Sequence, residues 1–127
     1  MTTAGQFYVE SRQKPGQTFN GFATADWNAA EANVVLIGAV GSRYKVHSLL
    51  LDISALIGTV TVRLYIKIDG VERQAYSYAF TVAVDGPGLW IINGIIGIHD
   101  VLRVTAQSNN AADDGTSIGY TYMLEAL

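Results

Sequence analysis

Residues 59–84 carry the most regular pattern in this chain. From Thr59 to Ile68 apolar side chains alternate with polar ones, which is the period of a strand with one buried face. Asp69-Gly70 follows, and it suits a two-residue hairpin turn because both residue types tolerate a positive φ. The alternation then resumes in a return strand whose apolar row is Tyr76, Tyr78, Phe80, Val82 and Val84. We therefore predict a long antiparallel hairpin that ends near Val84.

Other segments of the same kind follow along the chain, separated by turn-forming residues. The predicted strands are residues 34–40, 43–55, 89–98, 101–108 and 118–124. Within 43–55 the apolar positions change phase near His47-Ser48, which predicts a β-bulge there. Residues 89–98 are apolar on both faces, so we expect a second sheet to bury one side of that strand and the arm, residues 21–33 or another subunit to bury the other. Residues 21–33 fit either a single helical turn or an irregular loop.

The count of about eight short strands predicts an all-β fold. We expect residues 1–127 to form a single-domain antiparallel β-sandwich, because two packed sheets bury many half-apolar strands at once. An eight-stranded jelly roll fits the strand count best, and residues 1–20 are expected to form an extended N-terminal arm. An immunoglobulin-like sandwich of seven strands remains the main alternative.

Composition narrows the choice of partners. The chain of 127 residues has a net charge of −3, and its eight Lys and Arg residues are scattered, so we expect no nucleic-acid partner. No apolar stretch approaches the roughly 20 residues of a membrane span, so we expect no membrane partner. The N-terminus lacks the features of a secretory signal, which predicts synthesis in the cytoplasm.

Charged residues make up only 15% of the chain, against about 25% in an average domain. Two explanations remain open. A partner covers part of the surface, or uncharged Thr, Ser and Asn side chains keep it hydrated.

No motif in the sequence predicts catalysis. His47 and His99 have no His or Cys nearby, and we interpret them as structural or surface residues. The loop Asn109–Gly115 carries the oxygen ligands that Ca²⁺ prefers, but Asn, Asp and Gly are also ordinary turn residues, and the turn interpretation is favoured. With no cysteine in the chain, thiolate sites and disulfides are excluded. We expect no catalytic residue, no cofactor and no metal, and therefore no enzyme.

Tyr65 is the aromatic residue that stands out from the predicted core. It lies on the polar row of its strand between Arg63 and Lys67, where it is a candidate anchor of a partner interface. It is equally consistent with an ordinary strand residue of good β-propensity.

The N-terminal arm is the second predicted contact region. A short strand at Phe7 and Val9 precedes a polar turn at Lys14-Pro15-Gly16. We expect the arm to lie across neighbouring subunits, with strand addition to an open sheet edge as one efficient mode. The arm residues predicted to make these contacts are Phe7, Tyr8, Arg12 and Lys14.

Three segments, Tyr44–His47, Thr59–Tyr65 and Val101–Val104, resemble small virion proteins of tailed bacteriophages. In particular, residues 43–125 resemble the jelly-roll cement or decoration proteins of phage capsids in size, in strand order, and in the lack of cysteine and of a catalytic motif. The resemblance implies a protein of the capsid surface that braces the shell against internal pressure. Its implied partners are the major capsid protein and copies of itself, as a dimer or trimer.

Two other functions remain open at this point. One is a receptor- or glycan-binding head of a phage fibre, or a carbohydrate-binding module, and it predicts exposed aromatic residues on one face. The other is a small enzyme on a sandwich scaffold, and it predicts titratable groups that converge in a cleft.

Overall fold

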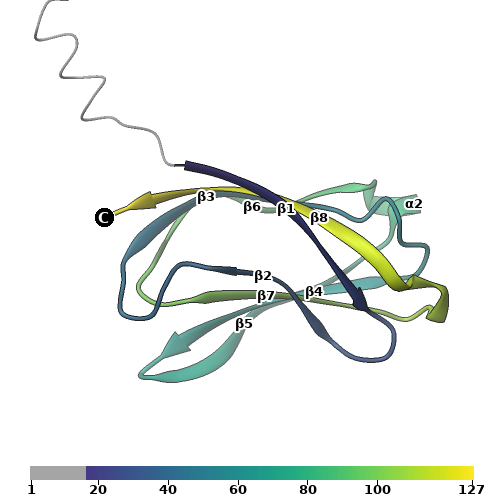
Figure 1. Cartoon of the computed structure of the whole chain (residues 1–127), viewed down its shortest axis with the longest axis horizontal. Helices are drawn as coiled ribbons and strands as arrows, with labels where there is room; N and C mark the ends of the chain where they lie inside the picture. Colours follow the sequence, from purple (N-terminus) through teal and green to yellow (C-terminus); the bar gives the residue numbers. More distant parts are fainter. Residues whose placement is uncertain (1–16) are drawn as a thin grey trace, which may run out of the picture.

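A computed structural model of the protein describes residues 17–127 (Figure 1). Within this range eight strands form two four-stranded antiparallel sheets that pack face to face. The elements in chain order are β1 (Gln17–Asp26), β2 (Ala32–Ile37), β3 (Tyr44–Asp52), β4 (Val60–Ile68), β5 (Val71–Phe80), α2 (Val82–Asp85), β6 (Gly88–Ile98), β7 (Leu102–Ser108), the 3-10 turn η1 (Ala111–Asp113) and β8 (Asp114–Ala126). None of the helices in residues 17–127 is long and apolar enough to cross a membrane.

The strand order is that of a jelly roll. The first sheet has the order β1-β8-β3-β6, and the second has the order β2-β7-β4-β5. Among the described strands only β4 and β5 are neighbours both in sequence and in a sheet, and each of the other connections between them crosses from one sheet to the other. Two interleaved Greek keys of this kind define the eight-stranded jelly roll. The predicted fold class is confirmed, and the immunoglobulin-like alternative is wrong.

The core lies between the two sheets and follows the period of two. Val60 and Val62 of β4 and Leu49 and Leu51 of β3 are almost completely buried. Trp27, in the turn after β1, is also fully buried, and its indole Nε1 donates a hydrogen bond of 2.8 Å to the carbonyl oxygen of Thr116. A buried indole usually needs such a partner for its N–H.

The predicted hairpin is present, but its return strand is shorter than expected. Asp69 (φ 53°) and Gly70 (φ 77°) form the two-residue turn, because both adopt the left-handed conformation that this turn requires. The return strand β5 ends at Phe80, and residues 82–85 form the short helix α2 instead of continuing the strand. Thr81 stops the strand, because its side chain accepts a hydrogen bond from the amide of Val84 and caps the helix.

The predicted β-bulge lies where the phase change indicated it. Ser48 adopts a φ of 49°, and the register of β3 against both neighbouring strands shifts between His47 and the residues that follow. The prediction is confirmed. The extra residue lets apolar side chains on both sides of the bulge face the same core.

The region before β2 differs from the prediction. Gln17–Asn20 belongs to β1 and not to an arm, and β1 continues through residues 21–26, the first six of the stretch that was expected to be a helical turn or loop. The strand is hard to recognise because its core-facing positions include the small residues Ala23 and Ala25. The remaining arm residues Phe7, Tyr8, Arg12 and Lys14 lie outside the described residues.

One expectation about burial is wrong, and for another the described residues supply only part of the expected cover. In β6, Trp90 and Ile95 are exposed on the outer side of the first sheet, and nothing in residues 17–127 covers them. In β5, Tyr76 and Tyr78 were expected in the core but are exposed. The reason is positional, because β5 and β6 are the outermost strands of their sheets.

Candidate functional site

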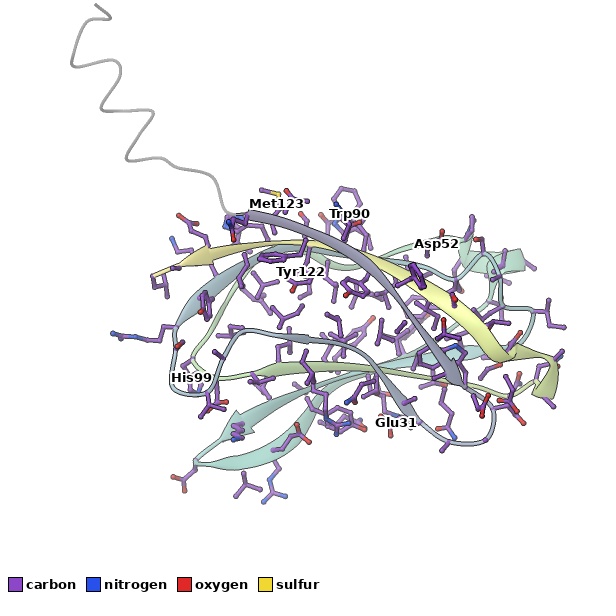
Figure 2. The ribbon with its side chains drawn as sticks, viewed as in Figure 1. Glu31, Asp52, Trp90, His99, Tyr122 and Met123 are labelled. Carbon is purple, nitrogen blue, oxygen red and sulfur yellow. The ribbon has the colours of Figure 1, made fainter. Side chains whose placement is uncertain are left out.

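The structure presents two large outer surfaces, one on each sheet. We call the outer side of the second sheet the Glu31 face; Glu31 lies on it in the lower part of Figure 2. Polar side chains from neighbouring strands meet there, because residues directly opposite each other in an antiparallel sheet share a face. The residues that meet are Glu31, Asn33, Arg63, Tyr65, Glu72, Arg103, Thr105 and Gln107.

Glu31 is the centre of this face. Its Oε2 accepts a hydrogen bond of 2.6 Å from the hydroxyl of Tyr65 and another from Thr105, which is fully buried. Its Oε1 lies 3.5 Å from Nη1 of Arg63. Burial by itself raises the pKa of Glu31. The hydrogen bonds from Thr105 and Tyr65 and the nearby arginines lower the pKa by more than burial raises it, so it lies below its usual value. The carboxylate is therefore held in its charged form.

Arg103 forms the second part of the same network. Its guanidinium donates to both carboxylate oxygens of Glu72, at 2.8 to 3.2 Å, and donates to Asn33 Oδ1 at 3.0 Å. It also lies over the ring of Tyr65, with 4.2 Å between Cζ and the ring centroid. The hydrogen bonds to Glu72 are the largest influence that raises the pKa of Arg103. The strongest polar groups of the Glu31 face therefore bind one another.

The structure brings two of the predicted interface residues together. Arg63 and Tyr65 share the carboxylate of Glu31, whereas Lys67 lies near the end of β4, with its Nζ 3.8 Å from Oδ1 of Asp100. Whether any of the three contacts a partner stays a prediction. Glu31 was not among the predicted residues, because it lies in the turn before β2 and no sequence spacing connects it to β4.

We call the outer side of the first sheet the Phe22–Trp90 face. Trp90 and Met123 lie on this outward side in Figure 2, and Tyr122 points to the core. The registers align two rows across the four strands. One row is Phe22, Gly119, Asp52 and Gly88, and the other is Asn20, Thr121, Leu50 and Trp90.

A shallow groove runs along these rows. It has a volume of about 350 Å³, and its lining includes Gly88, Gly119 and Thr121. The glycines leave the space open, because neither has a side chain above the sheet. Phe22, 72% exposed, and Trp90, 57% exposed, belong to the outermost strands on opposite sides of the groove. Two large apolar side chains thus lie in water on one face of the sheet.

Few charges accompany these aromatic residues. His47 Nε2 and Glu125 Oε1 form a pair at 2.9 Å on this face. Asp52 accepts a hydrogen bond of 2.9 Å from the amide of Ser54, and this bond lowers the pKa of Asp52. Lys45 adds an exposed charge at the start of β3, opposite Glu125. The row that ends at Trp90 contains no charged residue, so covering it loses little hydration energy, and exposed apolar patches of this kind are typical of interaction sites.

The Asn109–Gly115 loop uses its carboxylates to hold the backbone. Asp113 is buried and accepts hydrogen bonds from the amides of Ile57, at 2.8 Å, and Gly58, at 2.9 Å, and from the hydroxyl of Ser108. Although burial raises its pKa, the hydrogen bond from Ser108 and those from the two amides bring the pKa below its usual value.

Asp114 caps another turn, since its Oδ1 accepts from the amides of Asn28 and Ala29. These contacts fit the turn interpretation, and no group of three metal-ligating side chains lies together within residues 17–127. Of the two histidines, His47 pairs with Glu125, and His99 is exposed between β6 and β7.

The strand order defines a protein of the jelly-roll class, whose members include viral capsid proteins and lectins. No family model matches the chain. No curated protein matches it either. Similarity is found among solved structures.

A chain of the acid-stable capsid of Helicobacter pylori bacteriophage KHP30 is 16% identical, with a TM-score of 0.54 over 89% of this chain and 90% of that one. A chain of the disulfide-linked pili that form Bacillus endospore appendages is 14% identical, with a TM-score of 0.49 over 87% and 86%. The VP2 subviral particle of infectious bursal disease virus is 11% identical, with a TM-score of 0.36, and the match spans 90% of this chain but only 33% of VP2. At these identities the likeness to the phage capsid chain shows a shared fold.

Proposed function

We propose that this chain is a non-enzymatic structural protein of a virion, and specifically a cement or decoration protein on the outside of a phage capsid. The fold it shares with a chain of the KHP30 capsid supports a place in such a shell. The observation that carries the proposal is the Phe22–Trp90 face, which exposes large apolar side chains and few charges.

In this proposal the Phe22–Trp90 face docks on the major capsid protein. Trp and other large aromatic side chains contribute most to protein interfaces, because they bury a large area with few rotatable bonds. A stable interface removes roughly 800 Å² from water on each partner, which is within the capacity of one face of a four-stranded sheet. The Glu31 face supplies rigidity, since its hydrogen bonds tie β2, β4, β5 and β7 together.

Contacts between copies of the chain complete the proposal. Arg63, Tyr65 and Lys67 are proposed to contact a neighbouring subunit, and so are the N-terminal residues Phe7, Tyr8, Arg12 and Lys14. The protein is proposed to act as a dimer or trimer on the capsid surface after its synthesis in the host cytoplasm.

Quantitative mass spectrometry of purified virions from the source of this chain tests the proposal. The measurement is the copy number of this chain relative to the major capsid protein. We expect a ratio near one, or a simple fraction of one, because a cement protein occupies repeated positions of the lattice. A handful of copies per particle would instead place the protein in the tail or a fibre, and its absence from virions would overturn the structural role.

The groove between Phe22 and Trp90 favours glycan binding as the second candidate function. Aromatic rings stack on sugar rings, and Asn20 and Thr121, which share a hydrogen bond of 2.8 Å, offer polar groups at the groove. Calorimetric titration with neutral oligosaccharides would distinguish the candidates. Binding that is lost in Trp90→Ala, together with few copies per virion, would favour the glycan-binding head over the cement protein.

A further inference from the structure

β5 is the most exposed strand in the described part of the chain. It is the outermost strand of the second sheet and pairs with β4 on one edge only, as seen at the lower edge of the sandwich in Figure 1. Every residue from Val71 to Ala79 is exposed, and Phe80 is half-buried. The backbone donors and acceptors of its second edge therefore have no strand to bind within residues 17–127.

The inner side of β5 carries aromatic residues that nothing in residues 17–127 fully covers. Tyr78 lies opposite Val62 in the register, and Tyr76 lies opposite Leu64. Cross-strand partners share a face, and the two β4 residues are buried, so both tyrosines lie on the side that faces the first sheet. They are nevertheless 56% and 37% exposed. Ile96 of β6 lies opposite the buried Val46 of β3 and therefore faces the second sheet, yet it is 37% exposed as well.

β5 has fewer of the features that normally protect an edge strand than β6 has. It contains no proline, and its charged residues, Glu72 and Arg73, both lie next to the turn. The edge strand β6 differs, because Gly94 adopts a φ of 139° and the register of β6 shifts twice against β3. β5 has one register shift of its own, at Ala75, so residues 76–80 form the regular part of its edge. Bulges and charges discourage strand pairing, and a regular edge segment without them accepts another strand. β5 is therefore the better of these two edges for an added strand.

We propose that the free edge of β5 accepts residues 6–13 of a second copy of this chain as an added strand. This segment has the sequence Gln-Phe-Tyr-Val-Glu-Ser-Arg-Gln, with no proline and with strong strand formers at its centre. Because side chains alternate along a strand, Phe7 and Val9 share one face and can cover Tyr76 and Tyr78. The inference gives the proposed assembly role a definite contact between subunits.

The reach of the chain favours a second copy over the same copy. Residue 17 begins β1, on the opposite side of the sandwich from β5. An added strand beyond β5 lies roughly 20 Å from β1, given about 4.8 Å between strands and about 10 Å between sheets. Four residue steps, from residue 13 to residue 17, span at most about 14 Å. The contact is therefore head-to-tail, and such contacts form closed rings when the rotation between copies permits.

Two single substitutions in the full chain, with a matched control, test each side of the contact. Phe7→Asp disables the added strand, and Tyr78→Lys places a charge on the uncovered inner row of β5. Ala79→Lys is the control, because it adds the same charge to the same exposed strand on the opposite face. Circular dichroism establishes that each variant is folded, and sedimentation velocity measures mass against concentration. We expect the native chain and Ala79→Lys to associate, and at least tenfold weaker association in Phe7→Asp and Tyr78→Lys.

Mixing the two disabled variants gives the decisive result. The intact N-terminal segment of Tyr78→Lys can enter the intact β5 edge of Phe7→Asp, but the reverse contact is lost. We therefore expect a one-to-one heterodimer that grows no further. A native chain that stays monomeric at all concentrations would overturn the inference, and so would association that Phe7→Asp leaves unchanged, which would indicate pairing of two β5 strands. Because purified protein is used, the virion copy number still tests the proposed function separately.

Discussion

The two outer faces of this sandwich are both formed by antiparallel strands, but their side chains interact in different ways. On the Glu31 face, carboxylates, guanidinium groups and hydroxyls bind one another within the chain. On the Phe22–Trp90 face, the largest side chains remain exposed, and nothing in residues 17–127 covers them. A face whose polar groups are already paired contributes to stability, whereas an uncovered apolar face contributes to association. The comparison predicts that substitutions on the two faces change different quantities.

Glu31→Ala is expected to give the largest loss of stability. It removes the acceptor of the buried Thr105 hydroxyl and the partner of both Tyr65 and Arg63. An unsatisfied buried donor and lost charge-assisted hydrogen bonds together cost about 2–3 kcal/mol in the free energy of unfolding. Urea unfolding monitored by fluorescence measures the change. A loss below about 0.5 kcal/mol would show that the network is not a stabilising feature, and Trp90→Ser on the other face is the matched control.

Trp90→Ser is expected to show the opposite behaviour. The side chain is already 57% exposed, so its removal changes the free energy of unfolding by less than about 1 kcal/mol. If this face docks on the capsid, losing a large exposed aromatic residue costs about 2 kcal/mol of binding, or roughly thirtyfold in affinity. Co-sedimentation with capsids that lack the protein measures this effect. Equal binding by the native chain and the variant would remove this face from the proposed interface.

The pH dependence of stability is expected to come partly from the Glu31 face. The pKa of Glu31 is lowered in the folded protein, so the unfolded chain binds the proton more tightly. The stabilisation is therefore complete above the unfolded pKa of about 4.3, and it is lost as the pH falls through the folded pKa. Unfolding curves between pH 6 and pH 3 should show a shallower decline in Glu31→Gln than in the native chain. Identical slopes would contradict the assignment, because Asp52 and Asp113 contribute equally to both proteins.

How much of this could be predicted from sequence depended on whether the information was local. The β4–β5 hairpin was predicted because alternation and the Asp69-Gly70 turn are properties of neighbouring residues. The bulge at Ser48 was predicted for the same reason. β1 was missed because small residues occupy its core-facing positions, so its alternation is weak.

The two faces show the same limit at the level of the site. Tyr65 was predicted to point outward, since its position in an alternating strand decides its face. Its partner Glu31 lies 34 positions away in sequence, and only the pairing of β4 with β7 and of β7 with β2 brings the two together. The exposure of Trp90 was missed because a run of apolar residues does not reveal which strand lies at the edge of a sheet.

Substitutions at Ser48 are expected to have the smallest effects on stability. Its φ of 49° is unfavourable for a residue with a side chain. Ser48→Gly removes this strain but loses more backbone entropy on folding, so stability should change by only a few tenths of a kcal/mol. Ser48→Val adds a branched side chain at the same φ and should cost about 1 kcal/mol. The difference between the variants, measured by thermal unfolding, isolates the backbone conformation. The bulge also decides which residues of β3 face outward, because a shift of one residue moves each side chain to the other face. Ser48→Gly should therefore keep Leu50 on the Phe22–Trp90 face and leave capsid binding unchanged, and a loss of binding would show that the face depends on the Ser48 side chain itself.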